Sequence, residues 1–356
     1  MRIRFVVPFV LLLAALVPGS SYGAACPPMD CGPTAMAVAG GHLLAAGLGE
    51  GKPASIYDLS TGELRDTIPG AVISADGKRA VGQELQKITT YDLASGRVET
   101  VAQAPAGWTL SGISADGRRI VISRRAGGKT SFAVDDRKLT LPGKLELDGV
   151  LGDSLYLIEY TQNGYYVRVA SIATGKLAPE PLKDADEPAL IQGQPWSRLG
   201  SRDGRYLFTL YITGDGKAMI HELDLRSGKA WCIDLPGGGD YVAAGSYALA
   251  LSRDGRRVYA AGGGYRSVAT VDVATHRIVR VARVPVMRGQ GTVFSSASLA
   301  PDGKRLAFSV GRTFVVYDLA RGRILRRVTL AGDSAVAYDA RGRLWAVGKD
   351  GILHGV

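Results

Sequence analysis

The chain has 356 residues, of which 46% are hydrophobic, 21% charged and 7% aromatic, and its formal net charge is +10. This composition is typical of a globular protein with a sizeable core. It excludes a disordered chain, a collagen-like repeat and a small disulfide-rich scaffold. Glycine is abundant, at 47 residues, which favours many tight turns over long helices.

The N-terminus, residues 1–24, predicts a secretory signal peptide, which leaves residues 25–356 as the exported domain. Arg2 and Arg4 precede an apolar stretch over residues 5–17, and small residues follow it, as signal peptidase requires. The stretch is too short to span a hydrocarbon core of about 30 Å, so cleavage is favoured over a transmembrane anchor. Loss of the two arginines leaves a mature charge of +8 (10 minus 2). We expect a periplasmic or secreted protein.

The first cysteine has two alternative fates. After ordinary cleavage, Cys26 and Cys31 are disulfide candidates in an oxidising compartment. Residues 23–26, Gly-Ala-Ala-Cys, also partly resemble a bacterial lipobox, with Gly23 where leucine is usual. A lipid anchor at Cys26 would leave Cys31 and Cys232 as the only pair. The sequence leaves the connectivity open.

The exported domain alternates two turn motifs. The first follows an apolar segment and reads Ser/Ala-x-Asp-Gly-Lys/Arg, at residues 74–78, 114–118, 201–205, 252–256 and 300–304. It predicts a hairpin, because glycine adopts a positive φ without steric cost. The second reads Asp-x-x-Ser/Thr-Gly, at residues 58–62, 92–96 and 224–228, with variant copies at 272–276 and 318–322. There the aspartate side chain caps a tight turn.

The segments between these turns are short and rich in β-branched residues, and none shows a run at helical period. Each repeat therefore predicts four antiparallel strands. The Asp-Gly aspartates are 40 residues apart from Asp76 to Asp116 and 51 apart from Asp203 to Asp254. Four-stranded units at this period predict an all-β fold, a β-propeller whose blades bury their faces against one another.

Residues 300–308, Ala-Pro-Asp-Gly-Lys-Arg-Leu-Ala-Phe, resemble the repeat of TolB-type propellers. The combination of both turn motifs resembles YVTN-type propellers, including the propeller subunits of quinoprotein amine dehydrogenases. The resemblance covers residues 34–356 and concerns turn-forming residues, so it implies the fold more than an activity. It also implies an alternative role as the propeller subunit of a periplasmic redox complex, in which the quinone sits in a separate chain.

The blade number follows from the first hairpin of each repeat. These hairpins begin near residues 34, 70, 109, 145, 195, 245, 294 and 334, which predicts eight blades. Only seven fourth strands can be assigned, so seven blades is the alternative. Residues 26–33 are expected to supply the missing strand and to close the ring.

Binding residues are expected at the end of the ring opposite the repeat turns, where the connections vary in length and sequence. Three connections there are long, at residues 183–195, 236–246 and 285–292. Charged and aromatic side chains in these and neighbouring loops suit a small polar ligand or a protein partner at the mouth of a central channel. The alternative is that the loops are solvated and the tyrosines pack locally. The candidates are Arg124, Arg125, Tyr165, Asp184, Asp186, Glu187, Trp196, Tyr211, Asp240, Tyr241, Tyr265, Arg266, Arg288 and Gln290.

The sequence predicts no catalytic residue, metal or cofactor. The four histidines lie too far apart for a zinc signature, and residues 184–187 lack the spacing of a calcium loop. Lysines and arginines after the Asp-Gly turns make that end of the ring basic, although export disfavours nucleic acid as a partner. The favoured interpretation is an exported scaffold that binds a ligand or protein. The alternatives are the redox subunit and, after it, a lactonase-like hydrolase with an acidic metal site.

Overall fold

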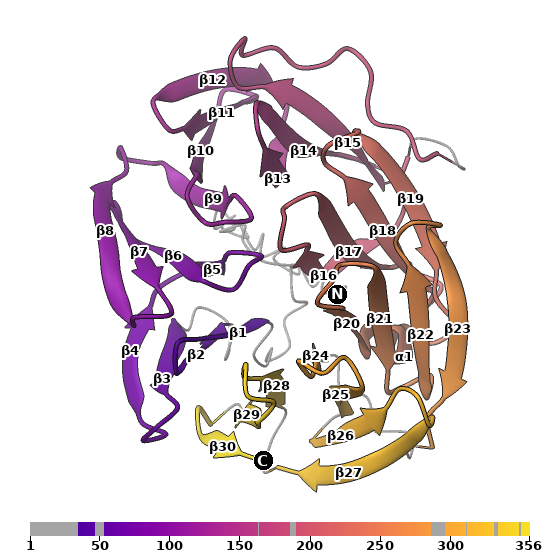
Figure 1. The fold of residues 1–356 in the computed structure, drawn as a ribbon. Coiled ribbons are helices and arrows are strands. Elements are labelled where there is room, and N and C mark those ends of the chain that lie inside the picture. Colours follow the sequence, from indigo (N-terminus) through magenta and orange to yellow (C-terminus); the bar gives the residue numbers. More distant parts are fainter. Residues whose placement is uncertain are drawn as a thin grey trace, which may run out of the picture.

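A computed structural model describes residues 35–46, 53–162, 164–185, 190–285, 296–310, 312–330, 334–348 and 350–356. Almost all regular structure in these residues is antiparallel strand, in eight small sheets around a central axis (Figure 1). Each sheet is one blade, numbered 1 to 8 along the chain. The prediction of an eight-bladed β-propeller is confirmed, and the seven-bladed alternative is wrong.

The strands follow the chain in order from blade to blade. Blades 1 and 2 contain β1 (Ala35–Ala39), β2 (His42–Ala46), β3 (Ala54–Asp58), β4 (Leu64–Ile68), β5 (Val72–Ile73), β6 (Arg79–Glu84), β7 (Lys87–Asp92) and β8 (Arg97–Gln103). Blades 3 and 4 contain β9 (Thr109–Ile113), β10 (Ile120–Ala126), β11 (Lys129–Val134), β12 (Arg137–Pro142), β13 (Leu145–Leu151), β14 (Ser154–Thr161) and β15 (Gly164–Ser171). Blades 5 and 6 contain β16 (Gln194–Gly200), β17 (Tyr206–Ile212), β18 (Ala218–Asp224), β19 (Lys229–Asp234), β20 (Tyr247–Leu251), β21 (Arg257–Gly262), β22 (Ser267–Asp272) and β23 (Arg277–Arg283). Blades 7 and 8 contain β24 (Ala297–Leu299), β25 (Arg305–Val310), β26 (Thr313–Asp318), β27 (Arg323–Thr329), β28 (Ser334–Tyr338), β29 (Leu344–Gly348) and β30 (Leu353–Gly355).

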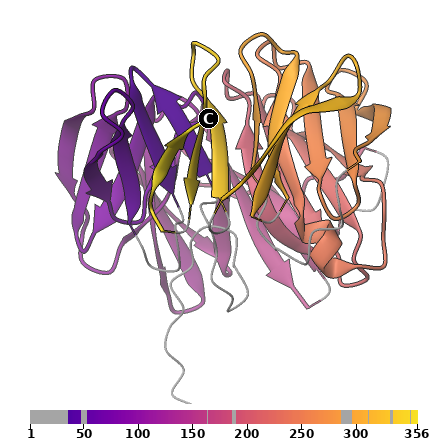
Figure 2. The ribbon, with the colours of Figure 1, turned by 90° about the horizontal axis from the view of Figure 1, so that it is seen from below.

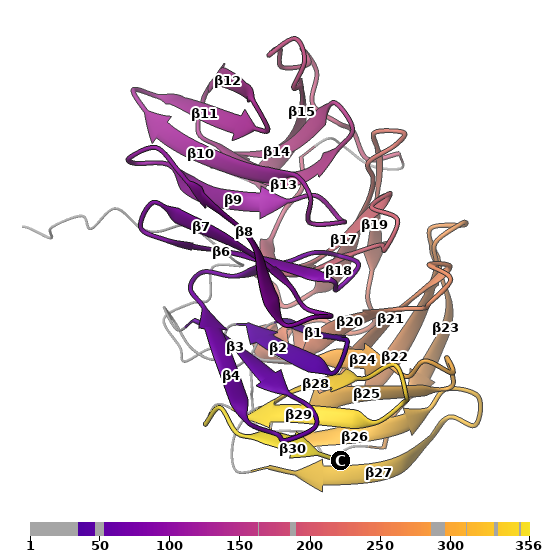
Figure 3. The same cartoon turned by 60° about the vertical axis from the view of Figure 1, so that its left-hand side comes forward.

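The first strand of each blade lies innermost and the last lies on the rim (Figure 1). From the side, the strands run between the two ends of the ring (Figure 2). Strands β1 and β28 are in contact where the first and last blades meet (Figure 3). The hydrophobic core lies between neighbouring blades. Phe208 and Ile220 of blade 5, for example, share one buried cluster with Tyr247 and Val258 of blade 6.

Both turn motifs lie at the same end of the ring, as predicted. In the first, Ser74 Oγ donates to Asp76 Oδ1 (2.7 Å), and Gly77 has a φ of 70°. In the second, Asp92 Oδ1 accepts from the Ser95 amide (2.6 Å). The amide of Leu93, within the second turn, donates to the carbonyl oxygen of Lys78 in the first (2.8 Å). Equivalent bonds join the two turns in blades 5, 6 and 7.

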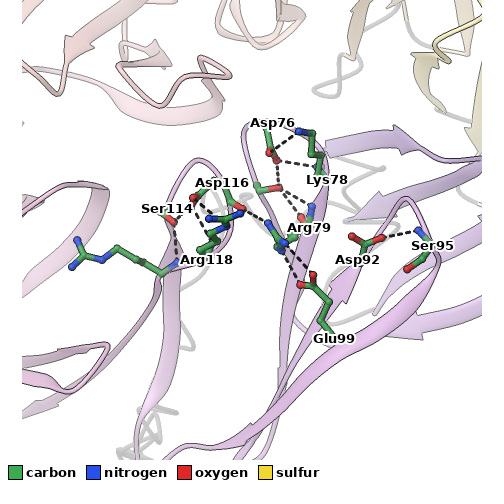
Figure 4. A network of polar contacts seen from close by, with 11 residues as sticks. Asp76, Lys78, Arg79, Asp92, Ser95, Glu99, Ser114, Asp116 and Arg118 are labelled. Carbon is green, nitrogen blue, oxygen red and sulfur yellow. Dashed lines mark hydrogen bonds and ion pairs between the residues drawn. The ribbon is translucent and has the colours of Figure 1, made fainter.

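In blades 2 and 3, the second basic residue after the Asp-Gly turn contacts the next blade (Figure 4), whereas Arg257 and Arg305 pair with aspartates of their own blades. Arg79 binds Glu99 through two hydrogen bonds of 2.7 and 3.0 Å, and its Nη1 donates to the carbonyl oxygen of Asp116 in blade 3 (3.0 Å). Arg119 likewise donates to the carbonyl oxygen of Gly152 in blade 4. These arginines at the turn end therefore hold blades together.

Two blades depart from four strands in the described residues. Blade 8 has three, and residues 26–33, predicted to supply its fourth, lie outside those described. Blade 4 also has three, although a fourth was predicted there. Isolated bridges replace that strand, pairing Ala170 with Leu177, Val167 with Leu182 and Tyr165 with Ile191. The prolines at 179 and 181 lack the amide protons that a regular ladder requires.

One helix, α1 (Tyr241–Gly245), was not predicted. It has five residues, too few to show a helical period, and the Asp240 side chain caps it by accepting from the Ala243 amide (3.0 Å). Within the described residues, no helix is long and apolar enough to cross a membrane.

Candidate functional site

The structure does not describe every predicted binding residue. Asp186, Glu187, Arg288 and Gln290 lie outside the described residues, as do the disulfide candidates Cys26 and Cys31. Their roles therefore stay predictions. The ten other binding candidates fall into two groups, one around α1 and one on blades 3, 4 and 5.

The first group surrounds α1, and its polar atoms shape the loops. The Trp196 indole donates to the carbonyl oxygen of Gly245 (3.1 Å) and contacts Tyr241 edge-on, with ring centroids 6.4 Å apart. The Tyr265 hydroxyl donates to the carbonyl oxygens of Gly216 (2.7 Å) and Asp240 (3.0 Å). Arg266 follows Tyr265 with a φ of 54°. These contacts support a structural role for the group.

The second group lies on blades 3, 4 and 5. Arg124 and Arg125 are exposed at the end of β10, and Asp184 bridges to Ala230 of β19. Tyr165 and Tyr211 were expected among the surface loops, but each is only 1% exposed. The alternation of β15 and β17 points both rings into the interface between blades 4 and 5, where they stack with centroids 5.2 Å apart.

The inner strands of blades 3, 4 and 5 share an irregularity. Each contains a β-bulge, which leaves Ser111 in β9, Asp148 in β13 and Trp196 in β16 without a partner residue on the adjacent strand. The other inner strands pair without such a shift over their described residues. Bulges re-aim side chains and are frequent beside functional sites. These three consecutive blades thus differ from the repeat at their innermost strand.

The bulge in β13 brings Asp148 against Arg198 of β16. Their ion pair joins blades 4 and 5 at 3.0 Å, with Asp148 only 5% exposed and Arg198 37% exposed. Burial acts to lower the pKa of Arg198, but the carboxylate of Asp148 and the neighbouring tyrosines outweigh it and raise that pKa. Arg198 is therefore positively charged, and its side chain is partly accessible to water. Close by, Arg125 pairs with Glu146 of β13 at 2.8 Å.

Four aromatic rings form a continuous row beside this ion pair, from the half-exposed Tyr160 to the buried His221. Tyr160 is 48% exposed and lies 6.1 Å from Tyr165 between ring centroids. Tyr165 stacks on Tyr211, which lies 6.1 Å from His221. Burial, followed by the charge of Glu146, raises the pKa of Tyr160 to about 12. Burial also raises the pKa of Tyr165 and Tyr211 and lowers that of His221. The phenols are therefore protonated and the imidazole is neutral near pH 7.

Both ring nitrogens of His221 are buried without a hydrogen-bond partner among the described residues. Oδ1 of Asp148 is also buried and is held by the ion pair with Arg198. Buried polar atoms in folded proteins are nearly always satisfied by protein, ordered water or ligand. We call Asp148, Tyr160, Tyr165, Arg198, Tyr211 and His221 the inter-blade polar cluster. It offers neutral donors and acceptors beside one ion pair, which suits the binding of a polar group.

Sequence reasoning missed four members of this cluster. Asp148, Tyr160, Arg198 and His221 lie within strands, away from the loops where binding residues were expected. The available signal was that Asp148 and Arg198 interrupt the apolar first strands of two consecutive repeats. No three or more His, Cys, Asp or Glu side chains gather as metal ligands in the described part of the chain.

Comparisons with known proteins give similarity of structure only. No family model matches the chain, and no curated protein matches it in sequence. Hydrazine synthase of Kuenenia stuttgartiensis is 14% identical over 80% of this chain and 94% of its own, with a TM-score of 0.49. Dihydro-heme d1 dehydrogenase NirN is 17% identical over 93% of this chain and 74% of its own, at 0.49. The Cps50 (Swd1) β-propeller domain of Myceliophteria thermophila is 14% identical over 80% of this chain and 95% of its own, also at 0.49. At these values the similarity says nothing of ligand or reaction.

Proposed function

We propose that this protein is an exported binding propeller, with its ligand or partner site at the inter-blade polar cluster of blades 4 and 5. The observation that carries the proposal is that both buried ring nitrogens of His221 lack a hydrogen-bond partner among the described residues, in the same cluster as the Asp148–Arg198 ion pair. A fold that only needed stability would fill this interface with apolar side chains, as it does between blades 1 and 2.

The site favours a small polar ligand with a negatively charged or strongly accepting group. Arg198 is the water-accessible cation, and the protonated Tyr160 hydroxyl can donate beside it. Arg124 and Arg125 add positive charge at the same end of blade 3. The neutral imidazole of His221 supplies one donor and one acceptor.

The test is a thermal-shift screen of the mature protein against amino acids, dicarboxylates and sugar phosphates. A ligand that binds only the folded state at about 100 times its Kd stabilises it by about 2.7 kcal/mol. Arg198→Met should abolish the shift. Arg202→Met, at an exposed turn arginine, should leave the shift intact. A ligand that shifts all three proteins equally binds elsewhere and contradicts the proposal.

The resemblance of the repeats to amine dehydrogenase propellers supports a second proposal, a non-catalytic subunit of a periplasmic redox complex. It rests on turn residues such as Asp302 and Gly303, whose contacts are local. Purification from native periplasm tests it, since a cofactor-bearing subunit should co-purify at constant ratio. The lactonase-like alternative needs a metal held by acidic side chains, and no such group occurs among the described residues.

A further inference from the structure

The rim strands of blades 6 and 7 carry a concentrated positive charge. Strands β23 and β27 are the last strands of adjacent sheets and lie side by side on the outside of the ring (Figure 1). Neither contains an acidic residue. Together they expose six arginines, namely Arg277, Arg280, Arg283, Arg323, Arg326 and Arg327.

Most of this charge is unused within the fold. Arg280 donates to the carbonyl oxygen of Leu319 (2.8 Å), and Arg327 donates to that of Pro285 (2.6 Å), so these two join blades 6 and 7. The other four arginines make no side-chain hydrogen bond or ion pair in the described part of the chain. Rim strand β8 differs, because its Glu99 pairs with Arg79. Repulsion among six positive charges destabilises the folded state. Fewer charges would be enough to keep an exposed strand edge from pairing with other chains.

Aliphatic side chains lie between these arginines. Val279 and Leu325 occupy the same bulged position in their blades, and Val281 follows in β23. All three are about half exposed. Each rim strand therefore presents apolar side chains flanked by guanidinium groups. Among the residues that the structure describes, no strand pairs with its outward edge.

We propose that the edges of β23 and β27 dock an acidic protein segment in extended conformation. Such a segment can add as a further strand, because an open edge supplies backbone donors and acceptors at strand spacing. Its carboxylates would meet the arginines, and its apolar side chains would cover Val279, Val281 or Leu325. Each edge has seven residues, about 23 Å at 3.3 Å per residue, enough for a segment of similar length.

Two other anionic partners fit the surface less well. The rim of a ring is convex, so a flat bilayer would touch it only along a narrow strip. A single-stranded nucleic acid gains affinity from aromatic side chains that stack on bases, and neither rim strand contains one. This surface is separate from the inter-blade polar cluster, so either proposal can fail without the other.

Fluorescence anisotropy of the mature protein with a labelled peptide tests the proposal. The probe is an extended peptide that alternates aspartate or glutamate with valine. The rim variant Arg277→Glu/Arg283→Glu/Arg326→Glu should weaken its binding at least tenfold. The control variant reverses three exposed arginines at the turn end of the ring, namely Arg202→Glu/Arg226→Glu/Arg253→Glu. It makes the same change in net charge and should bind as the parent does.

Three further probes distinguish strand pairing from general electrostatic attraction. A peptide of equal charge with proline in place of valine lacks the amide proton at every second residue and cannot form a regular strand ladder, so it should bind at least tenfold more weakly. Anionic vesicles of phosphatidylglycerol and a single-stranded oligonucleotide serve as competitors. The proposal is overturned if the control variant loses affinity as the rim variant does. It is also overturned if the proline peptide binds equally, or if vesicles or oligonucleotide displace the peptide at lower concentration than unlabelled peptide.

Discussion

Glu222 gives the sharpest prediction of this structure, because a fully buried carboxyl must couple folding to pH. It lies at the interface of blades 5 and 6, where Oε1 is 3.0 Å from Nδ1 of His276. Burial, followed by the charge of Asp224, raises the pKa of Glu222 from 4.5 to about 8, whereas Arg205 opposes the change. We therefore expect Glu222 to carry a proton in the folded protein at neutral pH.

The sign and size of the effect follow from proton linkage. Between the unfolded pKa and the folded pKa, the native state binds one proton more than the unfolded state, so stability falls as pH rises. The slope is about 1.4 kcal/mol per pH unit, which amounts to about 2.7 kcal/mol between pH 5 and pH 7. This is an upper bound, since Nδ1 of His276 favours the charged carboxylate in the tautomer in which it donates to Oε1.

The assay is urea unfolding followed by tryptophan fluorescence at constant ionic strength. Glu222→Gln preserves the shape of the side chain but cannot titrate. Burial lowers the pKa of His221, which makes the stability of parent and variant alike rise with pH in this window. The test is therefore the stability of the parent minus that of Glu222→Gln, which should fall by up to about 2.7 kcal/mol between pH 5 and pH 7. Glu99→Gln is the control, because Arg79 lowers the pKa of Glu99 and it does not titrate in the window. If Glu222→Gln keeps the slope of the parent, so that the difference between the two proteins does not change with pH, the reasoning is refuted.

Three further changes test the turns and the interfaces through the free energy of unfolding. Arg79→Ala removes the contacts with Glu99 and blade 3 and should cost about 1 kcal/mol, while Arg118→Ala, 75% exposed, should change stability by less than about 0.5 kcal/mol. Tyr317→Phe removes a buried hydroxyl without a hydrogen-bond partner among the described residues and should stabilise by up to about 1 kcal/mol, whereas Tyr247→Phe loses its bond to Pro236 (2.6 Å) and should destabilise by about 1 kcal/mol; equal effects would contradict this. Gly40→Ala would place a Cβ 1.9 Å from the carbonyl oxygen of Ala94 and should cost several kcal/mol, while Gly41→Ala meets open space and should cost about 1 kcal/mol for its positive φ alone.

The ring could be predicted from sequence because its signals are local. An Asp-Gly turn or an Asp-x-x-Ser/Thr-Gly turn is specified by a few consecutive residues. The bonds at Asp76 and Asp92 are those that turn chemistry predicts. Repetition of these turns then fixes the number of blades. The same reasoning fails in blade 4, where the chain after Ser171 replaces a strand with isolated bridges to β15.

The inter-blade polar cluster could not be predicted because it depends on pairing across blades. Asp148 and Arg198 are 50 residues apart, and only the bulge in β13 turns the carboxylate toward the next blade. Tyr165 and Tyr211 were chosen for their place near loops, but strand alternation decides where a side chain points, and it buries both. A sequence shows which residues border a loop more readily than which face of a strand they occupy.

His276 shows how a departure from the repeat can mark a specialised contact. It stands where the motif has glycine, and its φ of 56° costs about 1 to 2 kcal/mol in a residue with a Cβ. The ring recovers this by stacking on Trp231 (3.5 Å between centroids), worth about 0.5 to 1.5 kcal/mol. Its contact with the buried Glu222 adds about 1 to 3 kcal/mol. The imidazole thus offsets the backbone strain, so restoring glycine at this position should destabilise the protein despite improving the turn.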